Sequence, residues 1–166
     1  MKAIQVDEEK DITKSTGGQV VQTFLPRGAN HLTTGDLAYI AGFFDGEGCV
    51  QVRKRGNRWE AMLRFINTSY PIMRWIADVT GGSLSTRKSY GPNRRRSFEV
   101  CLQHTQAEHW ARLLRPYLRI KADEIDLLLE FRKTISENHR KKLSDEVDQY
   151  RHDIAWSCGV LKRRAY

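Results

Sequence analysis

The chain has 166 residues, enough for one domain with its own hydrophobic core. It carries 28 lysines and arginines against 20 aspartates and glutamates, for a formal net charge of +8 and a pI of about 9.6. A basic excess of this size indicates a polyanionic partner. The three cysteines, Cys49, Cys101 and Cys158, form no CxxC pair, so neither a zinc site nor a disulfide framework is expected. The histidines form no HExxH motif, which argues against a zinc protease.

Residues 1–35 mix polar residues with Gly17, Gly18 and Pro26 and show no sustained periodicity. We therefore expect an N-terminal arm, followed by a single domain over residues 36–166. The arm lacks the apolar core of a secretory signal, and its acidic residues argue against a transit peptide. The protein is expected to work where it is made, in the cytoplasm of a prokaryotic cell or in an organelle that encodes it, with no membrane as a partner.

A helix is predicted over residues 36–46, with Asp36 as its N-cap. Ala38, Gly42 and Gly46 lie on one face of this helix because they are spaced four residues apart. Glycine costs about 1 kcal/mol in a helix interior, so two glycines on one face need a reason. Close approach by a second helix, as in small-xxx-small pairs, supplies one.

Glu47 falls at the C-terminal end of this helix, where the negative end of the helix dipole makes an anion unfavourable. A positive group is therefore expected beside it. A hard divalent cation bound through carboxylate oxygen would fit this position.

The rest of the chain alternates between strand and helix patterns. Residues 50–53 and 59–67 alternate apolar and polar residues around a turn at Gly56-Asn57, which predicts a hairpin. Pro71 and Gly81-Gly82 bound a helix, and residues 83–88 and 97–102 predict a second hairpin. Helices are predicted at 105–115, 121–138 and 142–157. The fold class is α+β, in the order αββαββα with extra C-terminal helices and an antiparallel sheet.

One face of the predicted sheet is polar and cationic. Residues 50–104 hold eleven basic residues against three acidic ones. With the apolar residues turned toward the helices, the other face presents side chains able to bond base edges in a major groove. This face carries Gln51, Arg53, Arg55, Glu60, Met62, Arg64, Ile66, Ser83, Ser85, Arg87, Ser97, Glu99 and Cys101. Basic residues in or beside the turns are expected to contact phosphates, namely Lys54, Arg94, Arg95 and Arg96. Arg58 and Lys88 are also expected to bind DNA. For Arg94 to Arg96, a plain solvated run of charge is the alternative.

The segment Tyr39-Ile40-Ala41-Gly42-Phe43-Phe44-Asp45-Gly46-Glu47-Gly48 closely resembles the signature of the LAGLIDADG homing endonucleases. Glu47 stands where many members carry Asp. The αββαββα order over residues 36–135 is also similar to that family. The resemblance implies a nuclease in which Glu47 binds Mg²⁺, or another divalent cation such as Mn²⁺ or Ca²⁺, with help from the backbone carbonyl of Gly46. It also implies that Lys121, at the start of the fourth helix, is an active-site lysine.

The chain contains one copy of the signature, whereas double-stranded DNA has two strands to cut. The resemblance therefore implies an intron-encoded homodimer that cuts a long pseudo-palindromic site. The expected dimer interface comprises Ala38, Ala41, Gly42, Asp45 and Gly46.

Two positions depart from the family pattern. Ser69 stands at the end of the second strand, where relatives often carry a long polar residue that positions solvent. Met73 stands in the next helix, where a basic residue is common. Arg74 and Asn67 are candidate substitutes, and the sequence does not choose between them.

Two other functions remain open at the level of sequence. A non-catalytic nucleic-acid binder, such as a maturase that folds its intron RNA or a DNA-binding regulator, would use the same basic face. The presence of Glu47 and Lys121 favours the nuclease, because a pure binder needs neither. A basic ribosome-associated domain would leave the paired glycines and the acid unexplained.

Overall fold

The computed structural model of the protein describes residues 32–87, 95–135 and 143–164. The first helix, α1, spans Thr34–Glu47, and the side chain of Leu32 before it is already buried in the core. The domain therefore begins by residue 32. The predicted arm lies almost entirely outside the described residues.

α1 begins two residues earlier than expected. Its N-cap is Thr33, whose hydroxyl accepts a hydrogen bond from the backbone N–H of Asp36 at 3.1 Å. The Asp36 carboxylate in turn accepts from the backbone N–H of Thr33 at 2.9 Å. This reciprocal pair is a capping box, so the prediction of Asp36 as the N-cap is wrong by one turn.

The sheet has four antiparallel strands in the order β1-β2-β4-β3. The strands span Gly48–Arg55 (β1), Arg58–Asn67 (β2), Ser83–Arg87 (β3) and Ser97–Gln103 (β4). A left-handed Gly56, with φ of +58°, turns the chain between β1 and β2. The two predicted hairpins and the α+β fold class are confirmed.

The remaining helices follow the predicted order with shifted ends. They span Tyr70–Thr80 (α2), His104–Leu114 (α3), the 3₁₀ turn Arg115–Tyr117 (η1), Ala122–Lys133 (α4) and Asp145–Arg164 (α5). Pro71 lies in the first turn of α2, and Gly81 closes the helix in the left-handed conformation. α4 is shorter than predicted, and α5 extends past its predicted end at residue 157.

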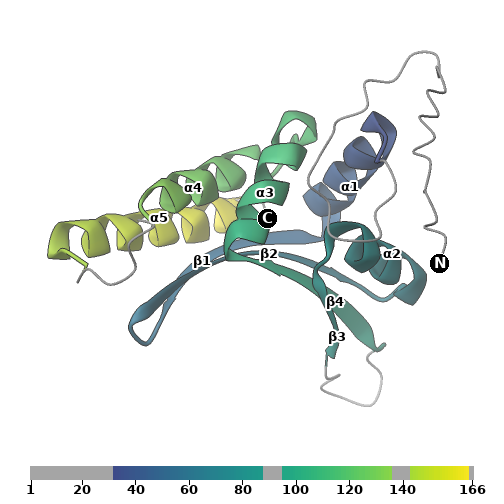
Figure 1. Ribbon diagram of the computed structural model, residues 1–166, viewed down its shortest axis with the longest axis horizontal. Helices are drawn as coiled ribbons and strands as arrows, with labels where there is room; N and C mark the ends of the chain where they lie inside the picture. Colours follow the sequence, from purple (N-terminus) through teal and green to yellow (C-terminus); the bar gives the residue numbers. More distant parts are fainter. Residues whose placement is uncertain (1–31, 88–94, 136–142, 165–166) are drawn as a thin grey trace, which may run out of the picture.

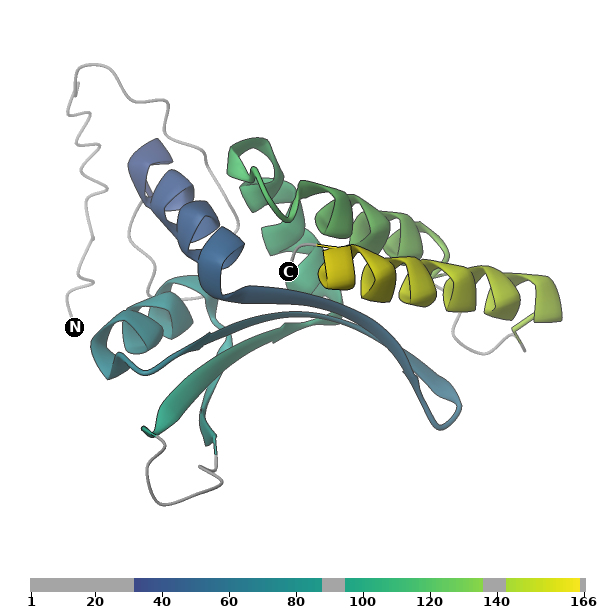
Figure 2. The same cartoon turned by 180° about the vertical axis from the view of Figure 1, so that it is seen from behind.

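The helices lie on one side of the sheet, and the sheet is bent into an arch beneath them (Figure 1). The view from behind shows the same layering, with the concave face free of helices (Figure 2). Val50, Leu63, Phe65 and Val100 point from the sheet into a core shared with Phe44 of α1. The Phe44 and Phe65 rings meet edge to face, with their centroids 5.0 Å apart.

α5 is fastened to the end of the first hairpin. The carboxylate of Asp148 accepts hydrogen bonds from Lys54 Nζ and Trp59 Nε1, each at 2.7 Å. These two donors lower the pKa of Asp148. Farther along α5, Arg151 donates to the backbone carbonyl of Thr134 at 2.7 Å, which ties α5 to the end of α4.

No helix within the described ranges is both long and apolar enough to cross a membrane.

Candidate active site and nucleic-acid interface

The acidic end of α1 passes directly into the sheet. Glu47 is the last residue of the helix, and Gly48 is the first residue of β1. A Cβ atom at Gly48 would overlap the ring and the carbonyl oxygen of Phe44, so glycine is required at this junction. Because no loop separates the helix from the strand, the backbone of Glu47 is held in a fixed position between α1 and β1.

Asp45 locks the end of α1 to the start of α4. Its carboxylate accepts hydrogen bonds from the backbone N–H of Arg119 at 2.7 Å and of Lys121 at 2.9 Å. The ammonium group of Lys121 donates back to the carbonyl oxygen of Asp45. Two segments far apart in the sequence are therefore held together by reciprocal bonds.

Lys121 supplies the positive group expected at this end of α1. The last turn of α1 has no basic residue of its own, and its orphan carbonyls carry partial negative charge. Lys121 is only 8% exposed and is the N-cap residue of α4. The structure thus places both predicted catalytic residues at one end of α1, while their catalytic roles remain predictions.

A cavity of about 350 Å³ opens beside these residues. Glu47 itself is exposed and lies between two residues of the cavity wall, Gly46 and Gly48. The wall consists of Asp45, Gly46, Gly48, Cys49, Ile120, Lys121, Glu124 and Lys162.

Two of these wall residues, Glu124 and Lys162, are absent from the predicted site. Glu124 is 5% exposed, and within the described segments no group donates a hydrogen bond to its Oε2 atom. Burial raises the pKa of Glu124, and the nearby Lys162 and Lys121 partly oppose that rise. Lys162 Nζ donates to Cys49 Sγ at 3.4 Å. Glu124 lies one turn after Lys121, a signal that could have drawn attention to it. Lys162 lies beyond the predicted end of its helix.

The oxygen donors at the end of α1 suit a hard divalent cation. Glu47 offers an exposed carboxylate, and Gly46 offers a backbone carbonyl at the negative end of the helix. The described residues contain no cluster of three or more His, Cys, Asp or Glu side chains that could hold a metal ion.

The strand register confirms the predicted polar face. Arg53 pairs with Glu60, Gln51 with Met62, and Ser85 with Glu99, so each pair shares a side of the sheet. This side is the concave face left free by the helices (Figures 1 and 2). The described members of the predicted set that lie on it are Gln51, Arg53, Arg55, Arg58, Glu60, Met62, Arg64, Ile66, Ser83, Ser85, Arg87, Ser97, Glu99 and Cys101. Met62 is only 5% exposed, so the prediction that its side chain contacts DNA is wrong, because neighbouring side chains cover it.

Several cations of this face are already paired with acids. Arg64 meets Glu99 through two bonds, at 2.9 and 2.6 Å, and Arg87 lies 3.5 Å from the same carboxylate. Arg53 meets Glu60 at 2.9 Å. The hydrogen bond from Arg64 to Glu99 raises the pKa of Arg64, with burial opposing it. These pairs hold the guanidinium groups in fixed positions across the strands.

Most of the described basic residues at the ends of the sheet have no acidic partner among the described residues. Arg55 and Arg58 face each other at the tip of the first hairpin, and neither forms an ion pair with another described residue. Arg95 and Arg96 are exposed just before β4. Lys54 is bonded to Asp148. Lys88 and Arg94 lie outside the described residues.

Part of the predicted dimer interface lies inside the chain. Ala41 is 0% exposed, and the Asp45 carboxylate is occupied by the start of α4. Assigning these two residues to the interface was wrong, because they pack within the protomer. Ala38, Gly42 and Gly46 are exposed, and a Cβ atom at Gly42 or Gly46 would meet nothing within 4 Å.

The residues suggested as substitutes in the solvent network lie elsewhere. Met73 is fully buried in the core, and Arg74 forms an ion pair with Asp78 at 2.9 Å on exposed α2. The side-chain oxygen of Asn67 accepts from the backbone N–H of Ser69 at the entry to α2. None of the four lines the cavity beside Glu47.

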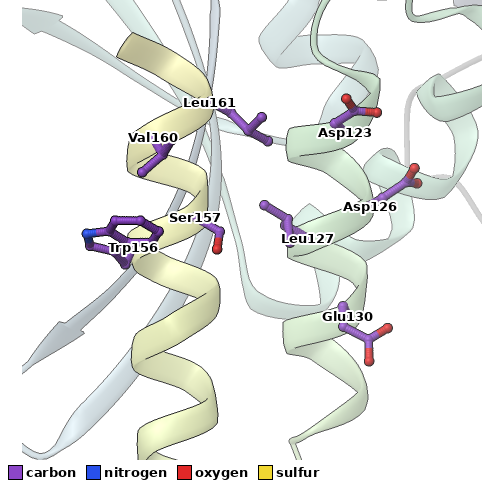
Figure 3. A pocket seen from close by; sticks show the side chains of 8 residues that line it. All are labelled: Asp123, Asp126, Leu127, Glu130, Trp156, Ser157, Val160 and Leu161. Atoms are coloured by element: carbon purple, nitrogen blue, oxygen red, sulfur yellow. The ribbon is translucent and has the colours of Figure 1, made fainter. Parts of the chain in front are cut away.

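A larger cavity, of about 540 Å³, lies between α4 and α5 on the helical side of the molecule (Figure 3). Trp156, which is 68% exposed, and Leu127 are among its apolar residues, and Asp123, Asp126 and Glu130 of α4 add acid. An acidic, apolar cavity is poorly suited to a polyanion. The smaller cavity at the end of α1 is therefore the better candidate site.

Comparison with known proteins supports the same architecture. No protein-family model and no curated protein matches the chain. Solved homing endonucleases do match. I-CvuI in complex with its target has a TM-score of 0.61 and 24% identity, over 75% of this chain and 80% of that one. The archaeal intron-encoded I-Vdi141I, complexed with DNA, has a TM-score of 0.61 and 14% identity, over 76% and 84%. The LAGLIDADG meganuclease I-AabMI, bound to uncleaved DNA, has a TM-score of 0.57 and 19% identity, over 72% and 43%. The signature segment on α1 and these neighbours together identify the architecture of this chain as the LAGLIDADG homing-endonuclease fold.

Proposed function

We propose that the protein is a site-specific DNA endonuclease that acts as a homodimer and hydrolyses both strands of a long pseudo-palindromic target. One observation carries this proposal. The hydrogen bonds between Asp45 and Lys121 hold Lys121 at the end of α1, where Glu47 is the last residue. The same fold presents a concave, cationic sheet face. A protein that only binds nucleic acid would need the sheet face, but it would not need a lysine held beside an exposed carboxylate.

The concave face is the proposed DNA-binding surface. Its arginines can bond guanine, and Gln51 can bond adenine. I-CvuI and I-Vdi141I, which share this architecture, are both seen with DNA. Arg55 and Arg58 at the hairpin tip are placed to contact phosphates, because no described acid neutralises them.

The proposed cofactor is Mg²⁺, held by Glu47 and the carbonyl of Gly46 together with groups from outside the chain. Two structures of I-CvuI were obtained with Ca or Mg. A bound divalent cation would stabilise charge on the phosphate and activate water. Lys121 uses one of its three N–H donors on Asp45, so two remain to bond a phosphate oxygen as negative charge develops.

A homodimer completes the proposed site, because one chain offers a single Glu47. The exposed stripe of Ala38, Gly42 and Gly46 on α1 lets a second copy of the helix approach closely about a two-fold axis. The two concave faces would then meet the two halves of the target. Encoding within an intron is part of the proposal, since I-Vdi141I is intron-encoded.

The proposal is tested with DNA that carries the host locus of the gene without its intron. We expect Mg²⁺-dependent cleavage of both strands that stops in EDTA. Glu47→Gln should lower the rate by at least about 100-fold while DNA binding persists, because the ligand charge is lost.

Glu130→Gln is the control, since it makes the same charge change on α4, at a residue outside the cavity beside Glu47. Cleavage by Glu47→Gln at the wild-type rate would contradict the proposed site. Tight binding by the wild-type protein without any cleavage would favour the alternative of a regulator or an RNA-folding maturase.

A further inference from the structure

Glu124 is a buried carboxylate with a free oxygen. It is 5% exposed, and no group in residues 32–87, 95–135 or 143–164 donates to its Oε2 atom. A buried polar atom that no protein group satisfies costs free energy, and a hydrophobic residue would avoid that cost. A buried carboxylate with an unsatisfied oxygen is therefore expected where function, rather than stability, selects the residue.

The surroundings of Glu124 indicate what that function is. Its side chain lines the cavity of about 350 Å³ beside Gly46 and Gly48, the two neighbours of Glu47 in the sequence. The same wall carries Lys121 and Lys162, and both lysines act electrostatically on Glu124. The cavity has room for several water molecules, and its polar wall can bond them.

Lys162 reaches this wall from α5, an element outside the αββαββα order. Its ammonium group donates to Cys49 Sγ at 3.4 Å, a weak bond that leaves two other donors free. Arg74 and Asn67, the candidate substitutes named from the sequence, do not line this cavity. Besides Asp45 and Cys49, its polar wall residues are Lys121 and Glu124 at the start of α4 and Lys162 on α5.

We propose that Glu124 and Lys162 are positioning residues of the active site, where Oε2 of Glu124 accepts a hydrogen bond from a water molecule in the cavity and Lys162 balances the charge. This inference rests on the proposed function. The water lies between the cavity wall and the phosphate, and Glu124 orients it without forming a covalent bond.

The test measures single-turnover cleavage, DNA affinity in EDTA and melting temperature for each variant. Glu124→Gln keeps an acceptor of the same shape and loses the charge. Lys162→Met keeps the alkyl chain and loses the ammonium group. We expect each to slow cleavage by at least about 10-fold with DNA affinity within about 3-fold of wild type. The melting temperature of Glu124→Gln should be equal to or above that of wild type, because a costly buried charge is gone.

Matched controls separate positioning from general charge effects. Glu130→Gln and Lys133→Met make the same changes on α4 outside the cavity and should cut at the wild-type rate. Lys162→Arg should recover most of the rate, because it restores the positive charge. The double variant Glu124→Gln, Lys162→Met should be no slower than the slower single variant, since the two residues act as one unit.

Three outcomes overturn the inference. The first is a wild-type rate in Glu124→Gln while Glu47→Gln is inactive, which leaves the proposed function standing. The second is a slow Glu124→Gln that has also lost stability and DNA affinity, which assigns the residue a structural role. The third is a wild-type protein that binds DNA and cuts nothing, in which case the proposed function fails as well.

Discussion

Glu99 forms ion pairs with two arginines of the proposed DNA-binding face. Its carboxylate accepts both bonds from Arg64 and lies 3.5 Å from Arg87. Arg64 also lies 3.5 Å from the side-chain oxygen of Gln51. A base or phosphate that binds this face must share or replace these bonds. If this face binds DNA as proposed, Glu99 should favour sequences whose bases replace its bonds to the arginines over sequences that offer only phosphate charge.

Replacing Glu99 with Gln should strengthen binding to random-sequence DNA. The ratio of the affinity for the target to the affinity for random DNA should therefore fall. Both arginines become free to contact phosphates, so random-sequence affinity should rise several-fold at low salt. The dependence of log K on log salt should steepen by up to about 0.9 for each new phosphate contact. Glu130→Gln, which makes the same charge change on the helical side, is the control. Unchanged affinity for random DNA in Glu99→Gln would show that the ion pairs do not restrain these arginines.

At the scale of elements, α5 runs from the tip of the first hairpin to the cavity beside Glu47. Asp148 near one end of the helix holds Lys54 and Trp59, and Lys162 near the other end lines the cavity. Between them, Ile154 and Cys158 are buried in the core. Burial raises the pKa of Cys158 to about 11, so this thiol stays neutral and acts as a small apolar residue.

Removing the Asp148 carboxylate should loosen the start of α5. In Asp148→Ala, amide hydrogen exchange in the first turns of α5 should be faster than in wild type, and cleavage should fall because Lys162 is held less firmly. Asp153→Ala is the matched control, since among the described residues this α5 carboxylate accepts only from Gln149, one turn away. Equal protection of α5 in both variants would contradict the fastening role.

The same contact sets a pH dependence. Because the pKa of Asp148 is lowered in the folded protein, its contribution to stability is present above the unfolded pKa of about 3.9 and is lost as the pH falls through the folded pKa. The difference in amide hydrogen-exchange protection of α5 between wild type and Asp148→Ala should therefore have its maximum value at pH 7. It should shrink only as the pH drops below about 4.

Local pattern predicted the sheet, and tertiary contacts set the ends of the helices. Alternation along β2 assigned Arg64 to the outer face because side-chain direction in a strand depends only on neighbours in sequence. The end of α5 was predicted before Gly159, a residue type that commonly stops a helix. Packing of Cys158 in the core carries the helix past that glycine. α4 ends early because Thr134 bonds to Phe131 and Arg151, and the second of these contacts is invisible in the sequence.

The candidate site divides in the same way. The sequence pointed to Glu47 and Lys121 because the signature segment and the element order carry them, and their catalytic roles stay predictions. It did not point to Glu124 and Lys162, which line the same cavity only because α4 and α5 pack together there. The assignment of Ala41 and Asp45 to the interface failed for a related reason. The spacing of residues shows which of them share a face of a helix. It does not show whether that face is buried within the protomer or left exposed for a partner.

At the scale of the whole molecule, the arch has one bare concave face and one bare helix stripe. The stripe runs along α1 through Gly35, Ala38, Gly42 and Gly46, all of them exposed. α1 is otherwise packed into the core through Leu37, Ile40 and Phe44. An exposed run of small residues on a well-packed helix leaves room for a second backbone.

Gly42→Leu separates folding of the chain from its association. A Cβ atom at Gly42 meets nothing within 4 Å in the part of the chain that the structure describes, so this part of the protomer has room for a side chain. Leucine is also the better helix former by about 1 kcal/mol, and the folded protomer should be slightly more stable. The added side chain would fill the space that a second α1 needs. We expect Gly42→Leu to sediment as a monomer, with double-strand cleavage lost.

Gly159→Leu is the matched control, because Gly159 lies in α5 and its Cβ position is also open within the chain. This variant should keep the wild-type mass and a melting temperature that rises with protein concentration, as expected for a dimer. A folded Gly42→Leu that remains dimeric and cuts both strands would remove α1 from the interface. The second carboxylate needed for the second strand would then have to come from a different arrangement of two chains.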